Sequence, residues 1–310
     1  MRNDTSDIFF KYFLALFPCL ILLLVGGILY QLLSSSSLAI HKFGFKFFAS
    51  RTWDPVIDEF GALPFIFGTC LTSFLALLIA VPIGVGSAIY LAEYAPSSVS
   101  KAISMLIDLL AAIPSVIYGL WGIFVLVPLM RNNVQPFLGK YLGFLPFFQG
   151  PNYGVGVLSA SIILAIIIVP FIISISREVI MTVPKVYKEA SYALGATRWE
   201  TIQKVILAHA KVGIFGAIIL ALGRAIGETM AVTMIIGNNP NMTFSLFSPG
   251  YTLASVIANE FSEATSEMYL SALIEIGLVL FIVSIVVNIL ARLLIWTVTS
   301  GESLALKTGV

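Results

Sequence analysis

The chain has 310 residues and a formal net charge of +1. Of these residues, 59% are hydrophobic and only 11% are charged, and the mean hydropathy is +1.01. This composition excludes an ordinary soluble domain and predicts a membrane protein with several spans. Both cysteines, Cys19 and Cys70, lie in apolar runs, so we expect neither a disulfide framework nor a cysteine-based metal site.

Six apolar runs are long enough to cross a bilayer, which takes about 20 residues of helix. They are 12–33, 64–92, 104–130, 154–176, 212–237 and 269–297. We interpret the first run as a retained anchor, although 34–39 weakly resembles a signal-cleavage site. The predicted fold class is therefore an all-α polytopic membrane protein.

The Lys and Arg residues predict how these spans are oriented. With the N-terminus inside, eleven of the 17 basic residues fall in inside segments and five fall in outside loops. Because cytoplasmic loops are the richer in Lys and Arg, both termini and the loop 184–211 are expected in the cytoplasm.

The outside loops contain few features that predict a function. Trp53 is expected to anchor the first loop at the membrane interface. The last loop contains a predicted short amphipathic helix at 252–261. Its acidic residues are either a docking face for a soluble partner or a solvated surface. They are Glu260, Glu263 and Glu267.

Polar residues inside the third and sixth spans need partners or water. Pro114 leaves a backbone carbonyl one turn back without its donor, and Ser115 and Tyr118 are near enough in sequence to satisfy it. This site is either a packing kink or part of a lining for a pathway. In the sixth span, Glu275 and Arg292 are each placed where they can reach the interface.

Arg224 lies in the middle of the fifth predicted span, where an arginine costs about 2.5–3.5 kcal/mol on insertion scales. Glu228 follows at the i+4 spacing at which helical side chains meet. Gly223 and Gly227 form a G-x-x-x-G that lets another helix approach closely. The two charges are either a self-neutralising ion pair or the lining of an anion pathway, in which the planar fork of arginine suits an oxyanion.

The loop 184–211 is a charged segment between two spans and is expected to form two short helices with a turn between them. Gly195 suits the left-handed end of the first helix. Thr197 and Glu200 have the spacing of a capping box at the start of the second. In that helix the apolar side chains should share one face. They are Trp199, Ile202, Val205 and Ile206.

The loop is similar to the E-A-A-x3-G-x9-I-x-L-P segment of ABC-importer permeases. Glu189, Ala190, Gly195 and Leu207 match that pattern. Departures are confined to Ser191, Val205 and Ala208, which replace Ala, Ile and Pro. The resemblance implies a type I (MetI-like) permease fold, with the first helix of the loop docking into a cytosolic ATPase.

Further segments resemble the permease subunits of phosphate-specific (Pst) ABC importers. They are G-R-A-I-G-E-T-M-A-V at 223–232, F-G-A-L-P-F-I-F-G-T at 60–69, L-A-E-Y-A-P at 91–96 and I-P-S-V-I-Y-G-L-W-G at 113–122. The M-A-V after Glu228-Thr229 is more similar to PstC-type than to PstA-type subunits. The resemblance covers about 50–297.

The resemblance implies a phosphate channel formed with a PstA-like permease, two PstB-like ATPase subunits and a PstS-like binding protein, in a bacterial inner membrane. It divides the chain into 1–63 (first helix and outside loop), 64–297 (permease core) and 298–310 (cytoplasmic tail). The sequence has no G-x-x-x-x-G-K-[ST], H-E-x-x-H or Cys/His cluster, so we expect no enzyme activity and no cofactor, with ATP bound by the partner. Two alternatives stay open, namely a permease for sulfate, molybdate or phosphonate, and a secondary transporter.

Overall fold

The computed structural model describes residues 5–308, with side chains for residues 10–293. Six described helical segments are long and apolar enough to span a membrane, which confirms the all-α polytopic class. They are Phe10–Ser35, Leu63–Tyr94, Ser115–Leu142, Val157–Met181, Arg198–Gly227 and Glu267–Leu293. Arg2 and the side chain of Lys307, both included in the count of basic residues, lie outside the described part.

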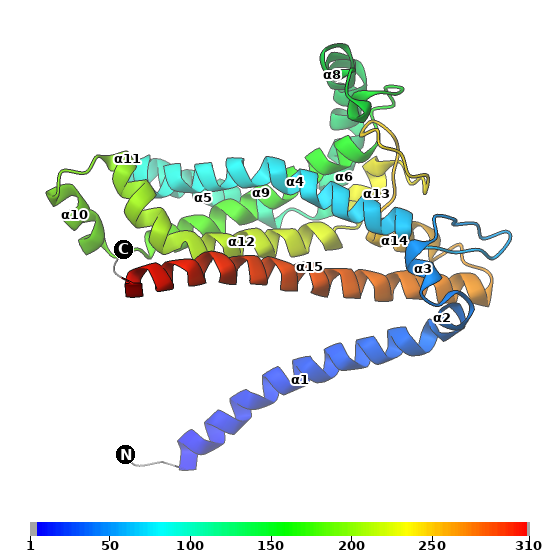
Figure 1. Cartoon of the computed structure of the whole chain (residues 1–310), viewed down its shortest axis with the longest axis horizontal. Helices are drawn as coiled ribbons and strands as arrows, with labels where there is room; N and C mark the ends of the chain where they lie inside the picture. Colours follow the sequence, from blue (N-terminus) through cyan, green and yellow to red (C-terminus); the bar gives the residue numbers. More distant parts are fainter. Residues whose placement is uncertain (1–4, 309–310) are drawn as a thin grey trace.

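The long helices run back and forth along one direction (Figure 1). They are α1 (Thr5–Ser35), α4 (Leu63–Ile89), α5 (Ser97–Ala112), α9 (Val157–Met181), α12 (Leu207–Gly227) and α15 (Glu267–Thr308). One end of this bundle, here called the α10 end, holds η1 (Tyr90–Tyr94), α10 (Lys185–Ala193), α11 (Arg198–Thr201) and η5 (Ile202–Ile206). The opposite end, here called the α14 end, holds α2 (Ser37–Phe43), α3 (Lys46–Ala49), α13 (Met230–Ile236) and α14 (Leu253–Glu260).

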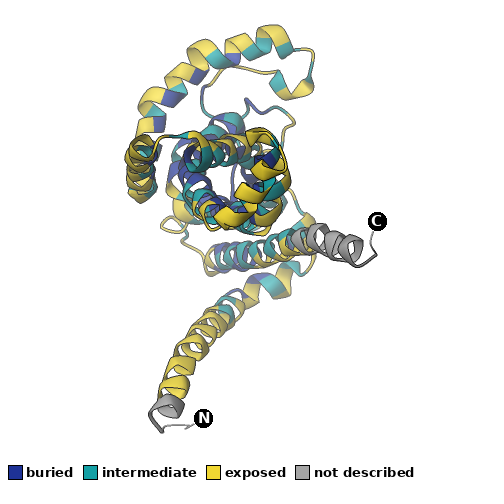
Figure 2. Ribbon diagram, turned by 90° about the vertical axis from the view of Figure 1, so that its left-hand side faces the viewer, coloured by how far each residue is buried: buried dark blue, intermediate teal, exposed yellow. Residues whose placement is uncertain are grey.

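The core of the bundle forms around α9, which packs against α4, α5 and α12. Within α9, 61% of the most apolar stretch is buried. Small residues bring the helices close, since a Cβ added to Gly84 would lie 2.6 Å from Cγ2 of Ile172. Figure 2 looks at the molecule from the α10 end and shows the buried residues gathered inside this ring of helices.

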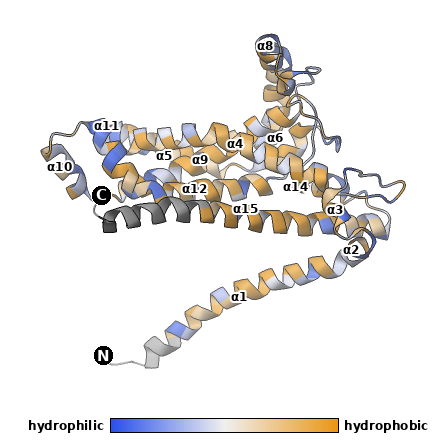
Figure 3. Cartoon of the chain, in the orientation of Figure 1, coloured by the Kyte–Doolittle hydropathy of each residue, from blue (hydrophilic) through white to orange (hydrophobic). Residues whose placement is uncertain are grey.

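Helix α1 stands apart from the core. None of the apolar stretch of Phe10–Ser35 is buried, and the helix diverges from the bundle toward its N-terminal end (Figure 1). Figure 3 shows that its surface is largely hydrophobic. An exposed apolar helix of this length faces lipid or another chain in a membrane.

The predicted third span, 104–130, is wrong as a continuous helix. The chain is helical in α5, turns extended at Ile113, and begins α6 (Ser115–Trp121) after Pro114. The stretch that follows α5 turns across the α14 end and away from the bundle (Figure 1). It comprises α6, η2 (Gly122–Leu126), α7 (Val127–Leu129), η3 (Met130–Val134), α8 (Gln135–Leu142) and the short η4 (Pro146–Phe148). Proline disfavours the helical conformation in the residue before it, which accounts for the break.

The fifth predicted span, 212–237, is also interrupted. Helix α12 ends at Gly227, Glu228 is extended with φ −69° and ψ 121°, and α13 begins at Met230. A broken helix at membrane depth is tolerated where it is buried in protein or lines a polar cavity. The break therefore singles out the segment that carries Arg224 and Glu228.

Two residues at the α14 end make packing contacts that the sequence did not predict. The half-buried Trp53 ring packs on Phe60 and Phe65, and its indole N–H donates to Glu260 Oε2 at 2.7 Å. Glu260 also accepts from the Tyr269 hydroxyl at 2.8 Å, so this acid ties the first loop to α15. Glu275 does not reach an interface, because it is only 3% exposed.

The rest of the last outside loop has the local structure predicted from the sequence. The predicted amphipathic helix 252–261 is observed as α14, capped by Thr252, with Leu253 and Val256 fully buried. Glu263 and Glu267 are exposed. Of these three acidic residues, only Glu260 therefore accepts hydrogen bonds from side chains packed at the α14 end.

Candidate functional site

Arg224 lies in the last turn of α12, close to the break, and is half-buried. Its guanidinium carbon stands 4.2 Å from the centre of the Phe171 ring on α9. Such a cation–π contact contributes roughly 0.5–2 kcal/mol and leaves the N–H donors free for other partners. Within the described residues, Arg224 Nε is enclosed and has no hydrogen-bond partner.

Glu228 is buried but does not pair with Arg224, so the expected i,i+4 contact is wrong. Its backbone leaves the helix, and its Oε1 lies 3.5 Å from the backbone N of Ala231 in the first turn of α13. The ion pairs found in the described part of the chain involve other residues. The end of α12 after Gly227 separates two charges that a continuous helix would have brought together.

Gly223 and Gly227 have open space where a side chain would stand. A Cβ at either position meets nothing within 4 Å among the described residues. The expected close helix–helix contact is therefore not made inside this chain. The surface next to Arg224 is left accessible to another chain or to water.

Tyr118 and Ser115 lie in the first turn of α6. The Tyr118 hydroxyl donates to the Leu110 carbonyl at 2.8 Å, which is the carbonyl four residues before Pro114. The same carbonyl also accepts from the backbone N–H of Ile113 at 3.2 Å, so Tyr118 is its second donor. Tyr118 also lies within electrostatic range of Arg224, so the fold brings together two of the predicted residues from different helices.

Asp108 is a further functional candidate that was not among the predicted site residues. It lies on α5, inside the predicted third span, and accepts a hydrogen bond from Ser174 of α9 at 3.0 Å. An acidic residue within an apolar run is itself a signal of function in a membrane protein and could have identified Asp108.

The loop at the α10 end has the predicted local structure. Thr197 and Glu200 form the capping box at the start of α11. Gly195 has φ +84°, in the left-handed region that glycine tolerates best. The hydroxyls of Ser191 and Thr201 lie 2.9 Å apart and join the two short helices. The loop is therefore a formed helical pair.

This loop is attached to the end of α4 through Glu93. Lys188 of α10 lies 2.5 Å from Glu93 Oε1, with side-chain exposures of 19% and 9%. Arg198 of α11 donates to the Glu93 carbonyl and stacks 4.4 Å from the centre of the Tyr94 ring. Both helices of the loop are thus anchored on one turn of the chain, η1.

The loop exposes several large apolar and aromatic side chains. Its exposed large side chains are Val186, Tyr187, Tyr192, Leu194 and Trp199. Glu189 and Ala190 are exposed on the same helix pair, and Leu207 is half-buried at the start of α12. The expected apolar face of the second helix is only partly buried, because Ile202 and Ile206 are enclosed while Trp199 is 53% exposed.

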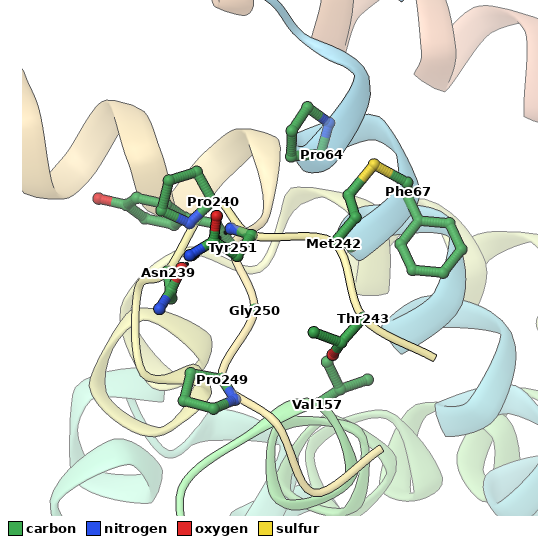
Figure 4. A pocket seen from close by; sticks show the side chains of 12 residues that line it. Pro64, Phe67, Val157, Asn239, Pro240, Met242, Thr243, Pro249, Gly250 and Tyr251 are labelled. Carbon is green, nitrogen blue, oxygen red and sulfur yellow. Dashed lines mark hydrogen bonds between the residues drawn. The ribbon is translucent and has the colours of Figure 1, made fainter. Parts of the chain in front are cut away.

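A pocket at the α14 end is too small for a substrate. Figure 4 shows it between Pro64 and Phe67 of α4, Val157 of α9 and the loop 239–251. Its volume is ≈ 20 Å³, about the room for one water molecule. Backbone hydrogen bonds from Gly156 to Ile235 and from Gly250 to Ile236, both 3.0 Å, hold the surrounding segments together.

Comparison with solved structures identifies the fold. A bacterial ABC transporter involved in the import of the acidic polysaccharide alginate aligns with a TM-score of 0.59, covering 93% of this chain and 97% of that chain. The MetNI methionine ABC transporter aligns with a TM-score of 0.51, covering 74% and 93%. Each is 18% identical to this chain, so these likenesses show the fold alone, and they confirm the predicted MetI-like permease fold.

Comparison of sequences identifies the family. Residues 80–296 match the family described as binding-protein-dependent transport system inner membrane component. The phosphate transport system permease protein PstC of Mesorhizobium japonicum is 47% identical over 277 residues, 88% of this chain and 85% of the relative. PstC of Haemophilus influenzae is 49% identical over 290 residues, 92% of each chain. The chain therefore belongs to the family of binding-protein-dependent transport system inner membrane components, in the branch formed by the PstC permeases.

Proposed function

We propose that this chain is a membrane subunit of an ATP-driven importer and that the importer carries inorganic phosphate. Relatives named as phosphate permeases match it over most of both chains. Arg224 is the single observation within the chain that carries the proposal. It is a cation within the spans that is not neutralised by Glu228 and whose Nε has no partner among the described groups.

An oxyanion crossing a region of low dielectric needs a compensating charge, and arginine supplies one with two parallel donors. Phe171 holds the guanidinium from one side without using those donors. Tyr118 and Ser115 line the same region, and Glu228 limits how tightly an anion is held there. A transport site must bind strongly enough to admit the ion and weakly enough to release it.

The loop at the α10 end is the proposed contact with the ATPase. Glu189, Ala190 and Gly195 shape its first helix, and the exposed apolar side chains around Leu194 offer a surface to a groove in the partner. Leu207 joins the loop to α12, the helix that carries Arg224. The movement that accompanies closure of the ATPases would thereby be transmitted to the substrate region along one continuous segment of the chain.

The remaining assignments follow from this role. The partners are a second, PstA-like permease, two PstB-like ATPase subunits that bind and hydrolyse ATP, and a PstS-like binding protein. The chain itself hydrolyses nothing. The α10 end and both termini face the cytoplasm of a bacterium, and 64–297 is the permease core in its inner membrane, with 1–63 and 298–310 as additions.

Uptake by the assembled complex in proteoliposomes tests both substrate and site. Phosphate, and not sulfate, molybdate or a phosphonate, should be accumulated with ATP, and preferred uptake of another oxyanion would overturn the assignment. Arg224→Gln should abolish uptake while assembly with the ATPase, measured by pull-down, is kept. The matched control is Arg292→Gln, which removes an exposed arginine of α15 and should transport normally.

Glu228→Gln and the double variant separate a pathway from a structural role. If the two charges only balance each other within the bundle, neutralising both should restore transport, because the net charge of the region is then unchanged. We expect the double variant to assemble and still fail to transport. Near-normal uptake by the double variant would end the pathway proposal.

A further inference from the structure

A groove lined by charged side chains lies between α5 and α9. Its volume is ≈ 450 Å³. The lining residues are Lys101, Ser104, Met105, Asp108, Leu109 and Arg177. Two cations and one carboxylate give it a net positive charge, and neither the family match nor the named relatives assign it a role.

The donors of the groove are only partly used. Arg177 Nη2 donates to Ser100 Oγ at 3.2 Å, but in the described part of the chain its Nε is enclosed without a partner. The hydroxyl of Ser104 is likewise enclosed and unpartnered within residues 10–293. Lys101 is exposed at the edge. Lys101 at the edge and the remaining guanidinium N–H groups of Arg177 are the donors available to an acceptor in the groove.

The groove and the Arg224 side chain both lie against α9. Arg224 stacks on Phe171, and three residues further along α9 Ser174 donates to Asp108. Arg177 follows after another three residues. At a rise of about 1.5 Å per residue, Phe171 and Arg177 are about 9 Å apart along the axis, with Arg177 nearer the α10 end.

The position of Asp108 indicates what the groove faces in the assembled complex. Asp108 is exposed in the single chain, although it lies in a helix of the membrane-spanning bundle. A carboxylate facing lipid there would cost several kcal/mol, so such residues face a water-filled passage or a partner helix. The groove therefore faces water or another subunit in the assembled complex.

We propose that this groove is an inner oxyanion site, in which Lys101 and Arg177 hold a phosphate group and Asp108 weakens the hold. One source of the phosphate group is the transported ion, passed on from Arg224. In that case the inference rests on the proposed phosphate import. The headgroup of an anionic phospholipid offers the same chemistry. The position of the groove and of Arg224 along the same helix, α9, favours the transported ion.

Chemical labelling of Lys101 tests the site without requiring transport. The complete complex, without its binding protein, is placed in nanodiscs of phosphatidylcholine and treated with an amine-acylating reagent, and labelling is measured by mass spectrometry. Inorganic phosphate should protect Lys101 but not Lys140, an internal control at the α14 end. Parallel nanodiscs containing phosphatidylglycerol test protection by lipid.

Two variants give opposite expected shifts. Arg177→Gln should abolish protection by phosphate. Asp108→Asn should lower the half-protecting phosphate concentration by about tenfold, which corresponds to about 1.4 kcal/mol, because the competing carboxylate charge is lost. If Arg177→Gln does not assemble, Asp108→Asn decides alone, since the amide keeps the shape and can still contact Ser174.

Each labelling result either supports or overturns the proposed site. Protection by phosphate in phosphatidylcholine alone supports the transported ion as the occupant. Protection only with phosphatidylglycerol overturns the proposal that the transported ion binds here and assigns the site to lipid. No protection in either membrane, or unchanged protection in Asp108→Asn, overturns the site altogether. A complex that imports phosphate but shows no protection overturns only this inference, and one that protects Lys101 but does not import overturns only the proposed function.

Discussion

Replacing Lys188 with glutamine is expected to loosen the loop of α10 and α11 from α4 while the membrane helices stay folded. The Lys188–Glu93 pair has a 2.5 Å separation and is mostly buried, with side-chain exposures of 19% and 9%. A hydrogen bond to a charged group contributes about 1.5–3 kcal/mol. A loss of about 2 kcal/mol lowers the ratio of attached to detached loop by about 30-fold. Arg198 still holds the Glu93 carbonyl, so the loop stays near its place.

The assay is ATP hydrolysis by the assembled complex, with and without its substrate-loaded binding protein. Basal hydrolysis should persist in Lys188→Gln, whereas stimulation should fall several-fold because motion is no longer passed from the loop to α4. The matched control is Lys204→Gln, which breaks an exposed pair, 3.7 Å apart with side-chain exposures of 75% and 43%. Such solvent-screened surface pairs contribute little to stability, so the control should behave normally.

Exchanging the two charges tests whether the contact itself matters. The double variant Lys188→Glu with Glu93→Lys should regain a large part of the stimulation, because opposite charges again face each other. Full stimulation in Lys188→Gln would refute the reasoning. So would an equal loss in Lys204→Gln, since the effect would then come from the charge of the loop and not from this attachment.

Two further substitutions test single features of the fold. Gly195→Val should cost about 1–3 kcal/mol of backbone strain at φ +84° and reduce stimulated hydrolysis, whereas Gly195→Asn should be milder. Normal stimulation and transport in Gly195→Val would show that the turn is unimportant. Trp53→Phe removes the 2.7 Å donor to Glu260 and should lower the stability of the α14 end by about 1–3 kcal/mol, measured as a lower midpoint of thermal unfolding in detergent. An unchanged midpoint would show that Tyr269 satisfies Glu260 by itself.

The sequence alone determined the features that depend on neighbouring residues. Apolar length decides which segments can cross a bilayer, and most predicted spans are observed close to their predicted ends. Capping is equally local, so Thr197, Glu200 and Gly195 have the predicted conformations. The family resemblance rested on spaced residues of the same local segments, and the comparisons confirm it.

Only the tertiary structure decided which distant residues meet. Glu93 and Lys188 are 95 positions apart, and no local pattern relates them. Asp108 meets Ser174, and Arg224 meets Phe171, because α5 and α12 both pack on α9. The pairing of Arg224 with Glu228 was the natural inference from helical spacing, yet the helix ends between them. The physical reason is that α13 begins afresh at Met230 in its own packing environment, with Ala231, Val232 and Ile235 buried, and such packing overrides local helical continuity.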